Sequence, residues 1–492
     1  MLYLLCSLFF VPIICSLISL SKKRDSKQLN YIARACSVFI FVVWLALYIT
    51  VKEQMMIMVG WLYLDALSIW ILLILSIMYM LVSFVSLDYL QRVSDAYVRN
   101  ENYTNHYYVL LHIFMAIMLV IPCLDNLGLM WVAIEATTLI SALLVAFKFT
   151  NLSVEAAWKY VMVCTVGICL ALLGTILLYY AQISASMSTE TLALNWHWLV
   201  NNAALLDPAT VKFAFLFIFV GYATKLGLAP MHTWLPDTYS LAPTPISGLL
   251  SGGLSTCVIY VIIKNIIVIK QCLPIDFVNN FFLFFGVLSI VLAFPFLLVQ
   301  REIKRMLAYS SIENMGILSI AIGVNNQIAT IGLLLHLLNH ALIKFSLFYI
   351  AGRIISDFKT NNMMRIHGML ISSPRLARLL LFAAFGIAGF PPFGLFFSKL
   401  YIIQGLFLEG FNWLAICTLI LLVGVFFGFF YHVIRMLSNS RTLHVKEQFS
   451  GLDSKVVVVA LLISIASALL LNDAPDSILQ QASVIIGGEL PR

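Results

Sequence analysis

Long apolar stretches recur along the whole chain of 492 residues, separated by short polar segments. A run of about 18 apolar residues or more is long enough to cross a bilayer as a helix. The windows that meet this criterion are 1–20, 31–51, 61–87, 107–124, 126–147, 158–183, 211–229, 242–263, 276–299, 306–323, 327–351, 379–405, 411–434 and 454–471. The pattern predicts an all-α polytopic membrane protein with about 14 transmembrane helices.

The composition agrees with this pattern, since 62% of the residues are hydrophobic and 10% are charged. Soluble domains carry roughly a quarter charged residues. No polar stretch is long enough to fold as a separate soluble domain, so a soluble enzyme or binding module is excluded.

The basic residues gather in every second loop, which predicts the orientation of the chain. One set of loops holds 21 Lys and Arg, beginning with Lys22, Lys23, Arg24 and Lys27 after the first window. The other set holds five, namely Lys52, Lys212, Lys264, Lys270 and Arg492. The positive-inside rule makes the first set cytoplasmic and places both termini outside. The net charge of +7 therefore does not indicate that the protein binds nucleic acid.

The cysteines and histidines indicate neither a metal site nor a cofactor. Nine cysteines are scattered without a C-x-x-C pair, as small buried hydrophobes would be. His336 and His340 are four apart on one predicted helix, so they cannot be the two axial ligands of one haem. Nothing in the sequence pairs His112 with His432. We expect no cofactor on this chain, so that any redox chemistry belongs to another subunit.

Several titratable residues lie inside the apolar windows. A charged side chain at the bilayer centre costs at least about 2.5–3.5 kcal/mol, so each one is expected either to pair with an opposite charge or to have a function. Glu135, Lys225 and Lys399 are of this kind. An ion pair between Glu135 and Lys225 that only locks two helices together is the plainer alternative.

The eleventh window adds a row of such residues. His336, His340 and Lys344 follow one another at intervals of four and therefore share one face of a helix, over about 12 Å. A row of titratable groups on one face is what a proton relay requires.

Two apolar windows are interrupted by glycine and proline. The seventh contains Gly227 and ends at Pro230, and the twelfth contains Gly389, Pro391 and Pro392. Proline breaks the helical hydrogen bonds, and a lysine lies near each break. An ordinary kink explains either one alone. Two of them, five helices apart, indicate two related halves with a site in each.

These residues resemble a known family, the antiporter-like membrane subunits of respiratory complex I, Mrp-type sodium/proton antiporters and membrane-bound nickel–iron hydrogenases. The likeness covers about residues 100–440, and its most specific element is the H-x-W-L-P-D block with a preceding K-x-G. The matching stretches are WVAIEATTLISALL, ATKLGLAPMHTWLPDTYSLAPTPISGLLSG, IKRMLAYSSIENMGI, HLLNHALIKFSLF and GFPPFGLFFSK. Within the family, IEATTLISALLVAF and YSSIEN are most similar to hydrogenase-4 component F.

The resemblance implies two inverted five-helix repeats, formed by helices four to eight and nine to thirteen. The chain then divides into three N-terminal helices (1–105), the first repeat (106–268), the second repeat (269–440) and a C-terminal helix with a tail (441–492).

The resemblance also implies a proton relay through the middle of the bundle. Its members are Glu135 and Lys225 on the fifth and seventh helices, His232 of the H-x-W-L-P-D block, His336, His340 and Lys344 on the eleventh helix, and Lys399 near the exit. Many relatives carry a lysine or histidine on the eighth helix, where this chain has Thr256 with Ser255 beside it.

Three functions follow from this resemblance. The first is a proton-translocating subunit, not itself catalytic, of a hydrogenase-4-like or complex I-like oxidoreductase in the bacterial cytoplasmic membrane. Its partners would be other membrane subunits and a peripheral arm with metal clusters. The second is a subunit of a Mrp-type monovalent cation/proton antiporter. The third is a non-conducting scaffold that kept the fold.

Overall fold

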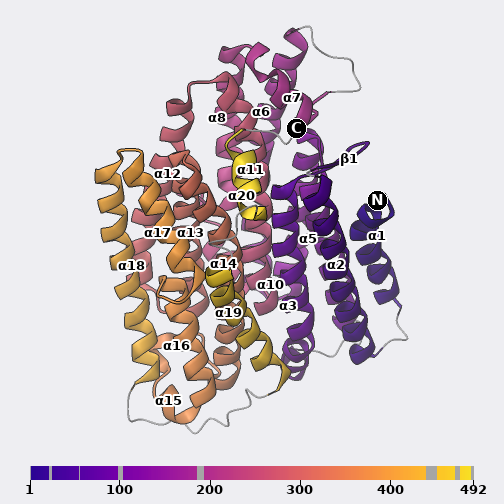
Figure 1. Cartoon of the computed structure of the whole chain (residues 1–492). Helices are drawn as coiled ribbons and strands as arrows, with labels where there is room; N and C mark the ends of the chain where they lie inside the picture. Colours follow the sequence, from indigo (N-terminus) through magenta and orange to yellow (C-terminus); the bar gives the residue numbers. More distant parts are fainter. Residues whose placement is uncertain are drawn as a thin grey trace.

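The computed structural model describes residues 2–21, 25–54, 56–97, 103–185, 193–438, 451–470 and 477–488. Its long helices run side by side in an elongated bundle, with α1 (Leu2–Ser19) at one edge and α18 (Asn412–Leu437) at the other (Figure 1). The basic residues Lys22, Lys23 and Arg24 lie outside the described residues.

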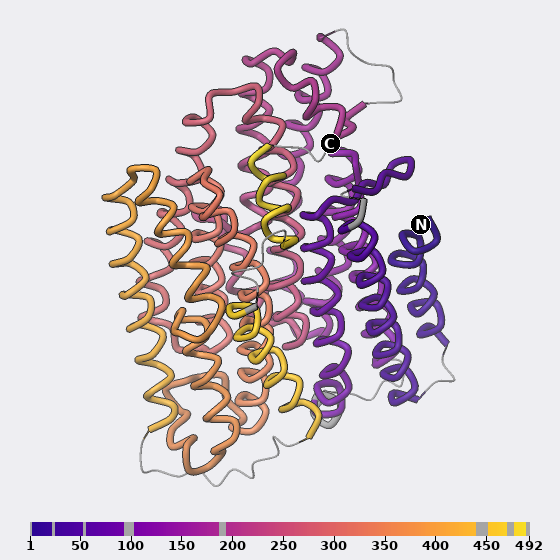
Figure 2. Tube along the Cα trace, viewed as in Figure 1, coloured from indigo at the N-terminus to yellow at the C-terminus, as the bar shows by residue number. Residues whose placement is uncertain are grey.

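The two ends of the bundle are named here after short helices that lie there. The α7 end carries α7 (Trp196–Asn202), and the α15 end carries α15 (Met369–Ser372) (Figure 1). Both marked termini lie toward the α7 end, as the trace in Figure 2 also shows.

The elements fall into two groups along the chain. Up to the first interrupted helix they are α1, α2 (Ser26–Gln54), β1 (Ile57–Val59), β2 (Leu62–Leu64), α3 (Ala66–Tyr97), α4 (Tyr103–Val120), η1 (Ile121–Cys123), α5 (Leu127–Val145), η2 (Ala146–Lys148), α6 (Asn151–Ser184), α7, η4 (Ala203–Leu205) and α8 (Pro208–Leu226). After it they are α9 (Leu235–Leu241), α10 (Thr244–Leu249), η5 (Leu250–Leu254), α11 (Ser255–Cys272), α12 (Ile275–Val299), α13 (Ile303–Val324), α14 (Gln327–Phe358), η6 (Met363–Arg365), α15, α16 (Pro374–Ala388), α17 (Gly394–Leu408), α18, α19 (Leu452–Leu470) and α20 (Ile478–Ile486).

The prediction of an all-α polytopic membrane protein is confirmed. Within the described ranges, thirteen helical stretches are long and apolar enough to cross a membrane. They coincide with thirteen of the fourteen predicted windows. The remaining window, 379–405, is divided into α16 and α17, because Gly389 ends α16 in the left-handed conformation at φ 80°.

The start of the third membrane helix differs from the prediction. Residues 57–64 form an antiparallel hairpin, and α3 begins only at Ala66. The carboxylate of Asp65 accepts a hydrogen bond from the backbone amide of Ser68 at 2.7 Å, which caps the helix N-terminus and fixes its start there.

The placement of Lys264 in an outer loop is wrong. The eighth membrane helix is one continuous stretch of α10, η5 and α11, and it runs past the predicted end to Cys272. Lys264 therefore lies within α11, where it is fully buried. An ion pair with Asp65 compensates its charge, which the sequence window did not reveal.

The C-terminal helices return to the middle of the bundle. α19 and α20, drawn in yellow, both pack against α3 and α14 (Figure 1). This arrangement joins the N-terminal helices to the part of the bundle that holds α14.

Candidate functional site

The first group of titratable residues within the membrane helices joins α5, α6 and α8. Lys225 is 2% exposed, and its ammonium donates to the hydroxyls of Thr138 at 2.8 Å and Tyr160 at 2.6 Å. The Thr138 hydroxyl in turn donates to the carboxylate of Glu135 at 3.1 Å. Thr165 on α6 donates to the other oxygen of the same carboxylate at 3.1 Å. Glu135 and Lys225 are thus linked through Thr138 instead of by direct contact.

The chain is interrupted directly after Lys225. Gly227 ends α8 in the left-handed conformation at φ 81°. Side chains then satisfy backbone groups that the break leaves free. The indole of Trp234 donates to the carbonyl of Thr224 at 2.9 Å, and Ser289 of α12 accepts from the amide of Ala229 at 2.9 Å.

The H-x-W-L-P-D block forms the turn after this break and the start of α9. His232 is partly buried in the turn, and its Nδ1 is a buried atom without a hydrogen-bond partner among the described residues. Asp237 accepts from Arg305 of α13 at 2.7 Å. The block therefore attaches the interrupted helix to the tenth membrane helix.

A second buried acid–lysine pair lies at the other interrupted helix. Lys399 on α17 donates to Glu313 on α13 at 3.4 Å and to the carbonyl of Ile387, in the last turn of α16, at 3.3 Å. The exposed fraction of the Glu313 side chain is 1%. A small cavity borders the pair and is also lined by Ser310 and Phe426.

Glu313 was missed in the sequence, although the signal was present. It is an acidic residue in the apolar window 306–323, which is the same criterion that singled out Glu135. The two acid–lysine pairs occupy corresponding places in the predicted repeats, on the fifth and seventh and on the tenth and twelfth membrane helices.

The histidines of α14 connect to the second pair. The Nε2 of His336 donates to the side-chain oxygen of Asn314 on α13 at 3.1 Å, and its Nδ1 lies 3.1 Å from the hydroxyl of Ser398 on α17. Asn314 also donates to Glu313 at 2.5 Å. The rings of His336 and His340 stack with their centroids 6.1 Å apart. The structure therefore connects His336 to the second acid through Asn314, whereas His340 contacts His336 by stacking and its Nε2 is buried without a hydrogen-bond partner among the described residues.

Lys344, one turn further along α14, is fully buried and donates to the carbonyl of Leu307 at 2.7 Å. The same carbonyl accepts from Ser311 at 3.2 Å, and the hydroxyls of Ser311 and Ser251 lie 2.9 Å apart. Ser251 belongs to η5, the single π turn that joins α10 to α11. This contact connects the eighth membrane helix to the surroundings of Lys344.

Thr256 lies directly after the π turn and is buried. Its hydroxyl donates to the carbonyl of Gly252 at 2.6 Å, and the neighbouring Ser255 donates to the carbonyl of Ser251 at 2.5 Å. Both hydroxyls thus bond to carbonyl groups of their own helix.

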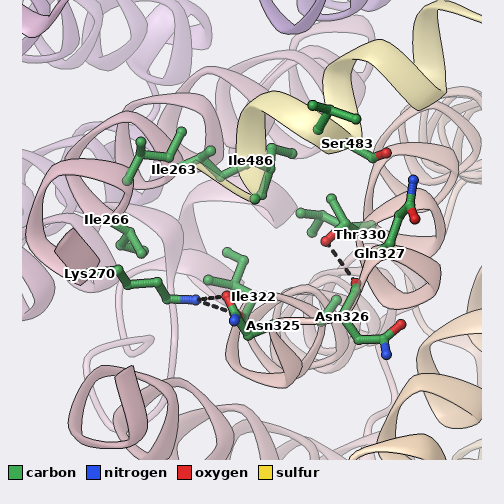
Figure 3. A pocket seen from close by; sticks show the side chains of 15 residues that line it. Ile263, Ile266, Lys270, Ile322, Asn325, Asn326, Gln327, Thr330, Ser483 and Ile486 are labelled. Atoms are coloured by element: carbon green, nitrogen blue, oxygen red, sulfur yellow. Dashed lines mark hydrogen bonds between the residues drawn. The ribbon is translucent and has the colours of Figure 1, made fainter. Parts of the chain in front are cut away.

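One cavity lies away from all these residues. It has a volume of about 370 Å³ and lies between α11, α13, α14 and α20 (Figure 3). Lys270 points into it and donates to Asn325 at 2.8 Å, and Thr330 and Ser483 line the opposite side. Within the described ranges, no three His, Cys, Asp or Glu side chains lie close enough together to hold a metal ion.

Comparison with known proteins gives the same family as the motifs. Residues 125–428 match the family described as NADH:quinone oxidoreductase/Mrp antiporter, TM. The chain is 39% identical over 285 residues to the hydrogenase-4 component F homolog of Methylacidiphilum infernorum, an alignment that covers 58% of this chain and 60% of that relative. The chain thus spans about 60% of the length of this relative.

Two solved structures share the fold. One is from the membrane-bound sulfane sulfur reductase, an archaeal respiratory membrane complex, with a TM-score of 0.86 and 20% identity over 98% of this chain and 97% of that one. The other is from the Mrp complex of Dietzia sp. DQ12-45-1b, with a TM-score of 0.85 and 16% identity over the same shares. The family match covers more than half of the chain, and the chain therefore belongs to the NADH:quinone oxidoreductase/Mrp antiporter family of membrane proteins.

Proposed function

We propose that this chain is a proton-translocating membrane subunit of a hydrogenase-4-like or complex I-like oxidoreductase. The observation that carries the proposal is two acid–lysine groups within the membrane helices, Glu135 with Lys225 and Glu313 with Lys399, each beside an interrupted helix. A charge inside the membrane is costly and a buried ion pair adds little net stability, so acid–lysine groups beside both broken helices are better explained by transport than by packing.

The relay in this proposal extends from one pair to the other. Its members are the predicted residues Glu135, Lys225, His232, Thr256, His336, His340, Lys344 and Lys399, together with Glu313. The contact between Ser251 and Ser311 supports proton transfer across the middle, because each hydroxyl both donates and accepts a hydrogen bond.

In the first pair, Thr138 links the two charged groups. A proton that leaves the Glu135 carboxyl for the Thr138 oxygen is matched by the hydroxyl proton moving to the amine of Lys225, which loads the lysine. When the interrupted helix moves Lys225 away from Thr138, the lysine proton is free to pass toward Lys344. The interrupted helices are therefore the elements whose movement would couple the relay to an energy source.

Such a source has to come from partner subunits. Moving one charge against 100 mV costs about 2.3 kcal/mol, and we expect no redox cofactor on this chain. We propose membrane partner subunits and a peripheral arm with metal clusters, in the bacterial cytoplasmic membrane. The basic loops support an orientation with the α7 end outside.

A Mrp-type monovalent cation/proton antiporter subunit is the second candidate. The likeness of the fold to the Mrp complex of Dietzia favours it. Both candidates use the same relay and differ in what drives it. Sodium dependence of transport supports the antiporter, whereas a metal-cluster subunit that co-purifies in stoichiometric amounts supports the oxidoreductase.

The test begins with the complex purified through a tag on this chain from native membranes in mild detergent. Mass spectrometry gives its subunits, and proteoliposomes with a pH-sensitive dye give its proton transport. We expect Lys225→Ala to abolish coupled proton transport without changing the subunit composition. Lys212→Ala is the matched control, because Lys212 lies at the start of the same helix with its side chain exposed. Wild-type transport by the Lys225→Ala complex contradicts the proposal.

A further inference from the structure

A fully buried ion pair near the α7 end has no part in the relay described above. The ammonium of Lys264 on α11 lies 2.7 Å from a carboxylate oxygen of Asp65, the residue that caps α3. Both side chains have an exposed fraction of 0%. The pair is thus removed from water at least as completely as Lys225 is.

Aromatic rings enclose the ammonium group. The ring centroid of Trp196 lies 3.5 Å from the Lys264 nitrogen, and those of Tyr63 and Tyr260 lie 5.0 and 5.4 Å away. The indole of Trp196 also donates to the Lys264 carbonyl at 2.8 Å. Such rings stabilise a cation without hydrating it, so the protonated form is kept in a dry site.

Polar side chains lead from this pair toward the middle of the bundle. Ser68 donates to Asp65 at 2.9 Å, and its hydroxyl lies 3.0 Å from that of Tyr260. Thr256, Tyr260 and Lys264 follow at intervals of four on α11 and share one face over about 12 Å. The face therefore runs from the π turn to the buried ion pair.

Other polar side chains lead from the pair toward the surface of the α7 end. Asp125 interacts electrostatically with Lys264. Its carboxylate accepts from the Asn195 amide at 2.5 Å and from the backbone amide of His197 at 3.2 Å. His197 is partly exposed, and its Nδ1 is buried without a hydrogen-bond partner among the described residues. This histidine stands between the buried acids and the surface.

We infer that the Lys264–Asp65 pair is a protonatable site, through which protons pass between the level of Thr256 and the surface of the α7 end. The inference rests on the proposed function. In this transfer the ammonium of Lys264 gives a proton to the carboxylate of Asp125, which it influences electrostatically without touching, leaving a neutral amine and a carboxylic acid. Asp125 passes the proton to the imidazole of His197, which releases it to water. The amine regains a proton from Asp65, which is supplied through the hydroxyls of Ser68 and Tyr260.

The alternative is that the pair only holds α3 against α11, and two variants separate the readings. Lys264→Arg keeps the charge but cannot release a proton, because arginine stays protonated in proteins. The double variant Lys264→Met with Asp65→Asn removes both charges of the pair and keeps a side-chain oxygen that caps α3, so the loss of the pair is not confused with the loss of the cap. A purely structural pair accepts at least one of these changes, whereas a protonatable site accepts neither.

We expect both variants to reduce proton transport by the purified complex in proteoliposomes at least tenfold, with the subunit composition unchanged. Transport above half of the wild-type rate in either assembled variant overturns the inference. If neither complex assembles, His197→Gln decides, because this residue is partly exposed and lies outside the ion pair. A tenfold loss in that variant supports the inference, and a wild-type rate overturns it.

The Lys225→Ala variant distinguishes this inference from the proposed function. If Lys225→Ala abolishes transport while the Lys264 variants transport normally, the proposed function stands and the additional site is wrong. If the Lys225→Ala complex transports protons normally, the proposed function fails whatever the Lys264 variants do.

Discussion

Glu135 and Lys225 share the hydroxyl group of Thr138, which accepts from the lysine and donates to the carboxylate. A hydroxyl group between the lysine and the carboxylate can relay a proton from one to the other, because it both donates and accepts a hydrogen bond. Small rotations of the Thr138 side chain change which of the two groups it contacts. Thr138 is therefore as important to this pair as the two charged residues.

The first prediction concerns this hydroxyl. Thr138→Val keeps the shape of the side chain but removes the link, leaving Lys225 with Tyr160 as its hydrogen-bond partner. A hydrogen bond to a charged group contributes about 1.5–3 kcal/mol, so we expect proton transport to fall at least tenfold. The measurement is the rate of proton transport by the complex in proteoliposomes. Thr138→Ser, which restores a hydroxyl, should recover most of that rate, and equal rates in the valine and serine variants would speak against the link.

The second prediction concerns Glu313, which the sequence interpretation overlooked. Glu313→Gln removes the charge that faces Lys399 but keeps the size of the side chain. If the two acid–lysine pairs act in series, this change should abolish transport as completely as Glu135→Gln does. The control is Glu409→Gln, because Glu409 is exposed at the α7 end, where it binds Asn326. Normal transport in the Glu313→Gln complex would remove the second pair from the relay.

The membrane helices were predictable because their signal is local. An apolar run of sufficient length has to be helical in a bilayer, where backbone groups cannot bond to water. The helix breaks were predictable for a similar reason, since Gly389 and the prolines after it act on their own segment. The start of α3 was not, because the hairpin before it and the cap at Asp65 depend on only a few polar residues.

The partners within the site were less predictable, since they come from different helices. No spacing in the sequence relates Thr138 to Lys225 or Lys264 to Asp65. Lys264 follows the last residue of an apolar window directly, so it was counted as a loop residue. A charged residue within an apolar window was the right criterion for a functional residue. The window 242–263 ended too early to include Lys264.

The third prediction concerns the attachment of α19. Arg353 on α14 is 2% exposed and pairs with Asp88 of α3 at 3.1 Å and with Asp453 of α19 at 3.8 Å. Removing one partner of a buried ion pair costs about 3–5 kcal/mol. Asp88 is partly exposed and also binds Arg92. We therefore expect Arg353→Met to lower the free energy of unfolding by an amount near the lower end of this range.

The measurement is the midpoint of thermal unfolding of the purified complex in detergent, together with protease cleavage near α19. We expect a lower midpoint and faster cleavage in the Arg353→Met complex. Arg378→Met is the control, because Arg378 is exposed near the same end of the bundle. If both variants unfold at the wild-type temperature, the ion pairs of Arg353 do not anchor α19.

The fourth prediction concerns transfer between the two halves. Ser311 contacts Ser251 of the π turn and shares the Leu307 carbonyl with Lys344, so it is the hydroxyl that connects α13 to the eighth membrane helix. Ser311→Ala removes this link and leaves every charged residue in place. We expect the rate of proton transport to fall about tenfold, which corresponds to the free energy of one hydrogen bond in a polar network.

The matched control is Ser319→Ala, since Ser319 is also buried on α13 but donates to the carbonyl of Phe282, away from the relay. Both variants lose one buried hydroxyl and should unfold at the same temperature, so a difference in transport alone would assign the effect to proton transfer. If the two variants transport protons at the same rate, protons cross between the halves without Ser311, and Thr256 then becomes the hydroxyl to replace next.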